Sequence, residues 1–147
     1  MDAAPLLSAG LFRPHRTTRR QTTRRLQRAA QDIRDGRRLL KTDPAWAAAL
    51  ALQGALQALR ALAFHAGLRP VAGPREEDAV ALFAAAAFGP QAAEEVTFLL
   101  RVGQAKRRAA NPAGYRVTSQ DAATAVTAAD RFLREYRQRL SIQPTLW

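Results

Sequence analysis

Apolar side chains along this chain recur with the spacing of an α-helix, and no run of residues keeps the alternation of a β-strand. The first helical stretch, residues 18–41, carries an apolar stripe that includes Leu26, Ile33 and Leu40. The part of this stretch before Leu26 has almost no apolar face. We therefore expect it to be disordered until a ligand binds to it.

The second stretch, residues 44–66, is the most apolar in the chain. Asp43 precedes it as a helix N-cap, Pro44 occupies the first helical position, and Gly67 supplies a stop. Leucine side chains cover most of the circumference of this helix. Because a helix that is apolar on most sides is normally surrounded by protein, we expect it to be the central member of the fold.

Three polar residues of the second stretch fall on one narrow strip of the helix: Gln53, Gln57 and Arg60. Buried polar groups need hydrogen-bond partners. The strip therefore faces solvent, pairs with Glu94 or Glu95 of a later helix, or lines an interface with another molecule. The sequence leaves these three alternatives open.

Three further helices are predicted in the second half of the chain. Residues 68–73 form a loop, and helices follow over residues 74–88 and 91–109, each with acidic residues near its start, where the helix dipole favours them. The last helix begins at Thr118, which has the spacing of a capping box with Asp121. Five helices joined by short loops predict an all-α fold, an antiparallel bundle of about five helices.

The length of 147 residues suits one compact domain. We assign residues 18–141 to the helical bundle, residues 1–17 to a flexible basic N-terminal arm, and residues 142–147 to a C-terminal tail. The start of the chain lacks the pattern of a secretory signal, and the apolar run at 45–66 is interrupted by Arg60. We therefore expect a cytoplasmic protein with no membrane span.

Composition excludes several kinds of chemistry. The chain has no cysteine, which rules out disulfides, thiolate metal sites and cysteine nucleophiles. Its two histidines, His15 and His65, are too few for a multi-histidine metal site. The sequence also lacks a glycine-rich phosphate loop, a zinc-binding HExxH motif and a serine nucleophile elbow. We expect no metal and no cofactor.

The charge of the chain is strongly positive and unevenly distributed. Lys and Arg number 23 against 12 Asp and Glu, a formal net charge of +11. Residues 13–41 hold eleven of the basic residues and two of the acidic ones. Within this segment Arg20, Arg24 and Arg28 lie four residues apart on the face opposite the apolar stripe, where guanidinium groups can bind phosphates. The alternative is a solvated arginine-rich segment that aids solubility.

A second basic cluster lies between the last two predicted helices. It contains Lys106, Arg107, Arg108 and Arg116, with the aromatic side chain of Tyr115 among them. These basic groups can contact phosphates while Tyr115 stacks on an exposed base. The alternative interpretation is structural, because basic residues commonly end helices and Tyr115 would cover the end of the bundle.

The helix pattern and this basic junction resemble the HEPN superfamily (higher eukaryotes and prokaryotes nucleotide-binding domains). The resemblance covers residues 26–140. It includes the apolar second helix ending in Ala-Phe-His-Ala-Gly-Leu-Arg-Pro, a penultimate helix running into Arg-Arg-Ala-Ala-Asn-Pro-Ala-Gly-Tyr, and a final amphipathic helix after Val-Thr-Ser-Gln-Asp. It implies a helical bundle that often dimerises, bringing two copies of a motif of Arg, a polar residue and His into one cleft.

Under this resemblance Arg108 corresponds to the motif Arg and Asn111 to the polar residue, while Tyr115 stands where the family has His. The active members are metal-independent ribonucleases, and others bind nucleotides or assist a nucleotidyltransferase partner. A Tyr with an ordinary pKa keeps its proton near neutral pH, whereas His exchanges one. We therefore expect a homodimer that binds nucleic acid (RNA or DNA) or nucleotides and is not catalytic.

Two alternatives stay open at this point. The first is a metal-independent, toxin-like ribonuclease with Arg108, Asn111 and Tyr115 as its catalytic residues. The second is a protein–protein interaction module whose basic N-terminal segment binds an acidic partner. The resemblance also implies a nucleotidyltransferase-like protein as a partner.

Overall fold

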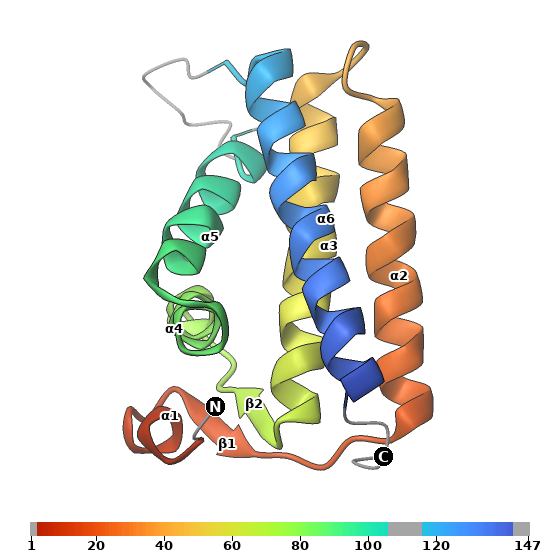
Figure 1. The fold of residues 1–147 in the computed structure, drawn as a ribbon. Helices are drawn as coiled ribbons and strands as arrows, with labels where there is room; N and C mark the ends of the chain where they lie inside the picture. Colours follow the sequence, from red (N-terminus) through yellow and green to blue (C-terminus); the bar gives the residue numbers. More distant parts are fainter. Residues whose placement is uncertain (1–2, 106–115, 143–147) are drawn as a thin grey trace.

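In the computed structural model, residues 3–105 and 116–142 are described, and they form six helices and two short strands (Figure 1). The elements are α1 (Ala4–Ser8), β1 (Phe12–Pro14), α2 (Arg19–Arg38), α3 (Pro44–His65), β2 (Leu68–Pro70), α4 (Glu76–Phe88), α5 (Pro90–Gly103) and α6 (Ser119–Ile142). The described part of the chain is mostly helical, which confirms the predicted all-α class with one small sheet added to it.

Helix α3 lies at the centre of the molecule and contacts α2, α4, α5, α6 and β2, as its apolar circumference predicts. Its start and end are the predicted ones. The Asp43 carboxylate accepts a hydrogen bond from the Trp46 backbone N–H at 3.1 Å, and Gly67 follows with a φ of 83°. By length and composition α3 could cross a membrane, but 67% of its apolar window is buried inside the protein, as in a core helix of a soluble protein.

Two glycines let neighbouring helices approach α3 closely. A Cβ atom added at Gly54 on α3 would lie 2.7 Å from Cγ1 of Ile33 on α2. One added at Gly103 on α5 would lie 2.5 Å from the Cβ atom of Leu52 on α3. Neither contact is sterically tolerable without movement of the neighbour, so both helix–helix distances depend on glycine.

One pair of neighbouring helices runs parallel, so the predicted antiparallel arrangement holds for only part of the bundle. The colour gradient of Figure 1 shows α2 and α3 running antiparallel, whereas α3 and α6 lie side by side and run in the same direction. Helices α4 and α5 occupy the return path between the end of α3 and the start of α6. This connection leads the chain back along the molecule, which permits the parallel pair.

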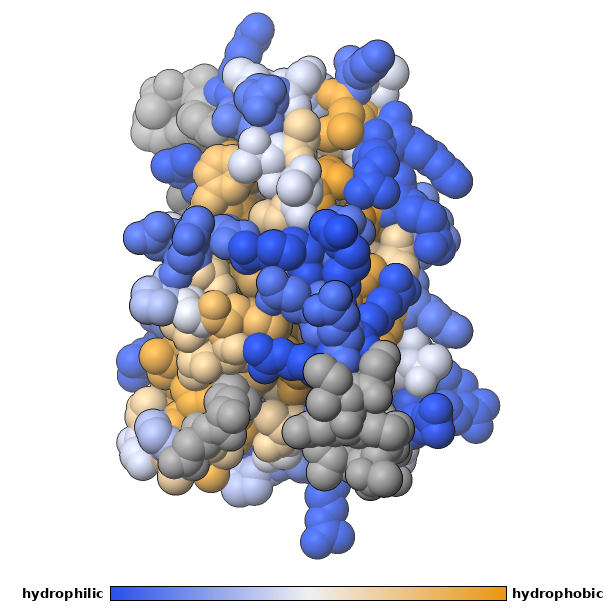
Figure 2. All heavy atoms as spheres, viewed as in Figure 1, coloured by the Kyte–Doolittle hydropathy of each residue, from blue (hydrophilic) through white to orange (hydrophobic). Residues whose placement is uncertain are grey.

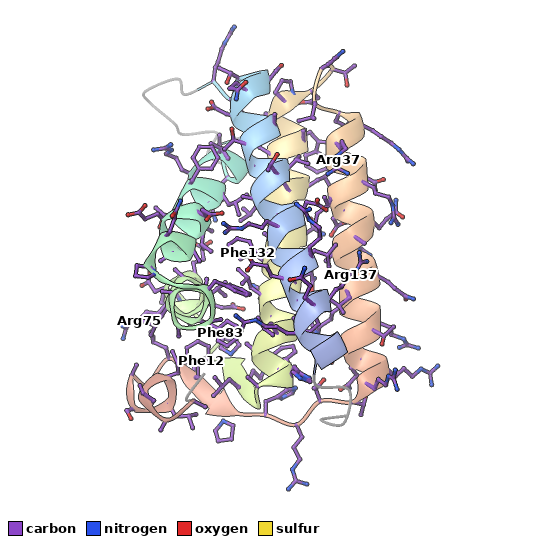
Figure 3. The ribbon with its side chains drawn as sticks, viewed as in Figure 1. Phe12, Arg37, Arg75, Phe83, Phe132 and Arg137 are labelled. Carbon is purple, nitrogen blue, oxygen red and sulfur yellow. The ribbon has the colours of Figure 1, made fainter. Side chains whose placement is uncertain are left out.

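Residues 3–17 pack against the bundle, unlike the flexible arm expected from their charge. Leu6, Leu11 and Phe12 are buried. The ring centroid of Phe12 lies 6.3 Å from that of Phe83 on α4, and Figure 3 shows the two rings close together near the base of the molecule. The basic residues of the segment remain exposed, so apolar burial anchors the segment while its charges stay in water.

A two-stranded antiparallel sheet replaces the loop expected at residues 68–73. The register pairs Arg13 of β1 with Arg69 of β2. The His15 backbone N–H donates to the Gly67 carbonyl at 2.8 Å and extends the pairing. The sheet therefore ties the N-terminal segment to the end of α3.

The first turns of helix α2, from Arg19, are helical although they were predicted to be disordered. The Thr18 hydroxyl accepts from the Gln21 backbone N–H at 3.2 Å, and the Gln21 side chain accepts from the Thr18 backbone N–H at 3.1 Å. This capping box satisfies two backbone donors at the start of α2. Thr22 is also buried. The expectation of disorder before Leu26 is therefore wrong.

Helix α6 begins with the predicted capping box between Thr118 and Asp121. Its apolar stripe is buried: Ala122, Val126, Ala129, Leu133 and Tyr136. The Tyr136 hydroxyl donates to the Ala61 carbonyl of α3 at 3.4 Å, and burial raises the pKa of this phenol. Helix α4 begins two residues later than predicted. The end of the predicted 91–109 helix and the tail at 143–147 lie outside the described residues.

Candidate nucleic-acid interface

The N-terminal half of α2 presents a row of arginine side chains to solvent. Arg20 and Arg24 are exposed on the side of α2 opposite the buried Thr22 and Leu26, and Arg19 is exposed in the first turn of the helix. We call these three arginines the α2 arginine face. Figure 2 shows hydrophilic side chains gathered along the edge of the molecule formed by α2.

The α2 arginine face has no carboxylate partner among the described residues. No ion pair within 4.0 Å involves Arg19, Arg20 or Arg24 in that part of the chain. The first turn of α2 holds no acidic residue. Because the N-terminus of a helix carries a partial positive charge, the helix adds to the field of these side chains.

The second half of α2 is different, because Arg37 and Arg38 pair with acids there, while Arg34 donates to the Gln31 side chain. Arg38 lies 3.7 Å from Asp35, and Arg37 lies 3.8 Å from Asp130 on α6. Arg28, at the boundary between the halves, lies 3.5 Å from Asp32. Burial raises the pKa of Asp32, and the nearby guanidinium of Arg28 opposes that shift.

The residues singled out in the sequence do not form one site in the described structure. Arg20, Arg24 and Arg28 share the exposed side of α2, as predicted. Arg116 is exposed just before α6 begins, at the opposite end of the bundle from the start of α2 (Figure 1). The other residues of the second basic cluster lie outside the described residues: Lys106, Arg107, Arg108, Asn111 and Tyr115.

The polar strip on α3 combines solvent exposure with internal pairing. Gln53 is exposed. Gln57 accepts a hydrogen bond from Arg25 of α2 at 3.2 Å, and Arg60 lies 3.0 Å from Glu76 of α4. Pairing with Glu94 or Glu95, one of the three alternatives, does not occur: the acid that Arg60 meets comes from the start of α4.

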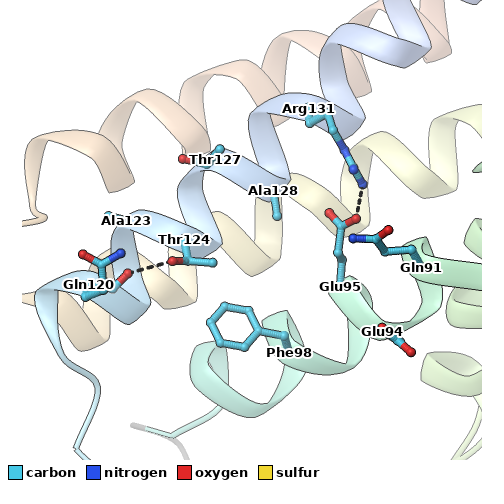
Figure 4. Close-up of a pocket in the computed structure, with 10 residues that line it drawn as sticks. All are labelled: Gln91, Glu94, Glu95, Phe98, Gln120, Ala123, Thr124, Thr127, Ala128 and Arg131. Carbon is cyan, nitrogen blue, oxygen red and sulfur yellow. Dashed lines mark hydrogen bonds and ion pairs between the residues drawn. The ribbon is translucent and has the colours of Figure 1, made fainter.

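A hollow of about 520 Å³ lies between α5 and α6, and its lining includes Glu94, Glu95 and Arg131 (Figure 4). Arg131 of α6 reaches Glu95 of α5 at 2.5 Å, and its Nε atom lies 3.7 Å from Glu135. Figure 4 shows Glu95 directed toward Arg131 and Glu94 directed away from it. Two carboxylates thus surround one guanidinium, so this hollow does not attract a polyanion.

The two histidines lie at the end of the bundle where α2 starts. The His65 ring packs edge-on against Tyr136, with centroids 6.3 Å apart, and burial lowers the pKa of His65. The His15 ring lies 4.6 Å from the ring of Phe64, and burial, Arg69 and Arg25 lower its pKa, in that order. Both rings therefore favour the neutral form.

Reasoning from the sequence did not single out Arg25. Its guanidinium lies 4.6 Å from the centroid of the Phe64 ring and pairs with Gln57. The only sequence signal is the position of Arg25 beside Leu26, at the edge of the apolar stripe of α2. That position makes a half-buried arginine plausible but names no partner, because Phe64 and Gln57 are 39 and 32 residues away.

Residues 3–105 and 116–142 contain no group of three or more His, Asp or Glu side chains placed to hold a metal ion. The chemistry available at the α2 arginine face is the binding of anions by guanidinium groups. Comparisons with protein-family models, with curated proteins and with solved structures found no match to this chain.

Proposed function

We propose that this chain is a HEPN-like helical protein that binds nucleic acid through the α2 arginine face and does not cleave it. The observation that carries the proposal is the absence of carboxylate partners for Arg19, Arg20 and Arg24 among the described residues. Arg37 and Arg38 on the second half of α2, and Arg131 and Arg134 on α6, have such partners.

The spacing of the arginines favours a strand of nucleic acid over a single small anion. Residues four apart on a helix are about 6 Å apart along its axis and lie on one face. Arg20 and Arg24 therefore offer successive guanidinium groups to a ligand that runs along α2. Planar guanidinium forks bind phosphate oxygens in pairs, and such contacts do not depend on base sequence.

The HEPN resemblance adds the remaining parts of the proposal. It supports a homodimer in which Lys106, Arg107, Arg108, Tyr115 and Arg116 form a second contact region. Independently of the resemblance, we propose a cytoplasmic location, because the one long apolar helix is mostly buried inside the protein. Tyr115 in place of His supports binding over catalysis, because an ordinary Tyr does not exchange its proton near neutral pH.

The proposal is tested by fluorescence anisotropy with a single-stranded RNA and a duplex DNA over a series of salt concentrations. If about six phosphates are neutralised, the logarithm of the association constant for duplex DNA falls with the logarithm of salt with a slope of about −5. Replacing Arg19, Arg20 and Arg24 with Gln reduces that slope by about 2 to 3. The absence of binding to either nucleic acid at low salt would overturn the proposal.

A matched variant controls for overall charge. Replacing Arg34, Arg38 and Lys41 with Gln removes the same number of charges from the C-terminal end of α2 and the turn that follows it, and should change the slope by less than 1. Incubation of the protein with RNA in EDTA tests the ribonuclease alternative. Cleavage that disappears in Arg108→Ala would support that alternative over simple binding.

The interaction-module alternative predicts a different result. A basic segment that binds an acidic protein retains its partner in a pull-down after nuclease treatment, whereas a nucleic-acid-binding segment loses material bridged by nucleic acid. The same pull-down, repeated with the variant that replaces Arg19, Arg20 and Arg24, shows whether the α2 arginine face holds the partner.

A further inference from the structure

Strands β1 and β2 place two arginines directly opposite each other. The register pairs Arg13 with Arg69, and both side chains are exposed, while the flanking Phe12 and Leu68 are buried in the core. Residues directly opposite in an antiparallel pair project from the same face of the sheet, and like charges there destabilise the pairing. A bound anion between the two guanidinium groups would remove this repulsion.

Arg25 of α2 and His15 extend the same positively charged region. Both pack on the ring of Phe64, with the guanidinium carbon of Arg25 and the His15 ring centroid each 4.6 Å from its centroid. Arg25 also donates to Gln57 at 3.2 Å. Phe64 and Gln57 hold these groups in place without neutralising any charge.

These four side chains, Arg13, His15, Arg25 and Arg69, form what we call the hairpin cluster. Burial, Arg69 and Arg25 lower the pKa of His15, and burial, Arg60 and Arg69 lower the pKa of Arg25. His15, Arg25 and Arg69 are therefore close enough for the positive charge of one to disfavour protonation of another.

The hairpin cluster has no acid to balance it in the described part of the chain. Glu76 pairs with Arg60 at 3.0 Å, and no ion pair there involves Arg13, Arg25 or Arg69. A neighbouring carboxylate is thus already used by another arginine. The three arginines of the cluster keep their positive charge, which is the condition for recruiting an anion from solution, and neutral His15 adds a hydrogen-bonding ring beside them.

The hairpin cluster also borders a hollow of about 330 Å³. The residues that line it are Arg13, Pro14, His15, Arg69, Pro70, Val71 and Ala72. Its walls are the two paired strands and the residues that follow β2, so its shape is set by backbone pairing. The opening is large enough for a phosphate group, and its charged side chains are all basic.

We propose that the hairpin cluster binds a phosphomonoester dianion, the terminal phosphate of a nucleic-acid strand. This assignment rests on the proposed function for the source of the phosphate, since Arg25 of the cluster directly follows Arg24 of the α2 arginine face and the hairpin lies at the end of the molecule where α2 starts (Figure 1). The shared chemistry, a tetrahedral dianion held by Arg13 and Arg69, also applies to inorganic phosphate. The two sources are therefore separated by experiment.

The first experiment measures thermal unfolding of the full chain in phosphate against sodium chloride of equal ionic strength. Inorganic phosphate at about ten times its dissociation constant should raise the unfolding temperature of the wild type by about 3 °C. Arg69→Gln and Arg13→Gln should each lose this shift. In phosphate-free buffer of low ionic strength they should unfold about 1–2 °C higher than the wild type, because a like-charge pair has been removed.

Arg101→Gln, an exposed arginine on α5, removes the same charge and should keep the full phosphate shift. Equal shifts in all four proteins, or no shift in the wild type, would overturn the site. A lower unfolding temperature for Arg69→Gln in phosphate-free buffer would also count against it, because that arginine would then be contributing to stability by itself.

The second experiment compares a single-stranded oligonucleotide carrying a 5′-phosphate with the same strand ending in a hydroxyl, and a 3′-phosphorylated strand in the same way. One of the two phosphorylated strands should bind the wild type about tenfold more tightly, and Arg69→Gln should abolish that preference while binding the hydroxyl-ended strand as before. Equal binding of all strands by the wild type overturns the end-phosphate assignment and leaves the proposed function intact. Failure of every strand to bind overturns the proposed function. In that case the rise in unfolding temperature in inorganic phosphate alone shows whether the hairpin cluster binds a phosphate.

Discussion

Arginines on α6 and arginines on the N-terminal half of α2 lie in different electrostatic surroundings. On α6, Arg131 contacts Glu95 and Glu135, and Arg134 lies 3.3 Å from Asp130. On α2, Arg20 and Arg24 have no such partner among the described residues. Both sets are at least partly exposed, so burial does not separate them; the position of the carboxylates does.

The difference shows how one residue type serves two purposes in a small bundle. Arg131 holds α5 against α6 through Glu95, while Arg134 pairs with Asp130 on its own helix, so both carry little net field into solution. Arg20 and Arg24 have no ion-pair partner among the described residues and concentrate positive charge at one end. We infer function from the second set because no structural role accounts for it.

The largest effect that should separate the two regions is on nucleic-acid affinity. Replacing Arg20 and Arg24 with Glu should weaken binding of a single-stranded RNA by about 100-fold at low salt, since two phosphate contacts become repulsive. Replacing Arg34 and Arg38 with Glu, the same charge change on the same helix, should weaken it by less than about fivefold. Anisotropy titrations measure both, and equal losses would show that only net charge matters.

A smaller effect is expected on the free energy of unfolding when the N-cap residue of α2 or of α6 is replaced. Thr18→Ala and Thr118→Ala each remove a capping hydroxyl and should lower the free energy of unfolding by about 1 kcal/mol. Added salt should stabilise both the wild type and Thr18→Ala, because it screens the repulsion of Arg19 and Arg20 from the start of α2, and the loss itself should stay the same because that repulsion is present in both proteins. The loss for Thr118→Ala, where Asp121 follows, should not fall with salt either. Denaturant unfolding at two salt concentrations gives both values.

A still smaller loss of stability should follow from breaking the ion pair between Glu95 of α5 and Arg131 of α6. Glu95→Gln removes one partner of Arg131 and should lower the free energy of unfolding by about 0.5–1 kcal/mol, the range for partly exposed ion pairs. It should also raise RNA affinity about two- to threefold, since one more guanidinium becomes available. Glu94→Gln, an exposed neighbour with the same charge change, should leave stability unaltered. An equal stability loss in both variants would argue against a specific role for the Arg131 pair.

The smallest expected effect is on the pH dependence of stability. The pKa values of His15 and His65 are lowered from 6.5 in the folded protein, so the unfolded chain binds more protons below that pH. Stability should be highest above about pH 7 and fall as the pH drops through 6.5 toward the lowered values. A variant with both histidines replaced by Gln should show a flatter profile between pH 7.5 and 5.5. A wild-type profile that rises over this fall in pH would contradict the assigned direction.

The elements that the sequence predicted well are those set by local signals. Asp43 and Pro44 start α3, and Thr118 with Asp121 starts α6. In each case the signal and the hydrogen bonds that it forms lie within four consecutive residues. The missed elements depend on distant pairing or on a few buried side chains. Strands β1 and β2 have three residues each, contain proline, and pair across more than fifty residues, so no alternating pattern marks them.

The arginines on α2 could be predicted from the sequence, whereas the hairpin cluster could not. Helical spacing alone placed Arg20, Arg24 and Arg28 on one exposed face. The same spacing places Asp32 four residues after Arg28 and no acid four residues from Arg24, so the ion pair of Arg28 was also within reach of the sequence although only the shared face was predicted. The hairpin cluster was out of reach, since Arg13 and Arg69 become neighbours only through the β1–β2 register. The spacing of Thr18 and Gln21 in the sequence is that of a capping box. The lack of apolar residues among the arginines that follow led to a prediction of disorder instead.

The most direct test of the central claim is an NMR titration that observes the arginine Nε–Hε groups during addition of a single-stranded RNA. Signals from Arg19, Arg20 and Arg24 should shift first and furthest, while those of Arg131 and Arg134 should remain in place. Shifts centred on Arg131 and the α5–α6 hollow, or no shifts in any arginine at low salt, would contradict the claim that unpaired arginines at the start of α2 meet a polyanion.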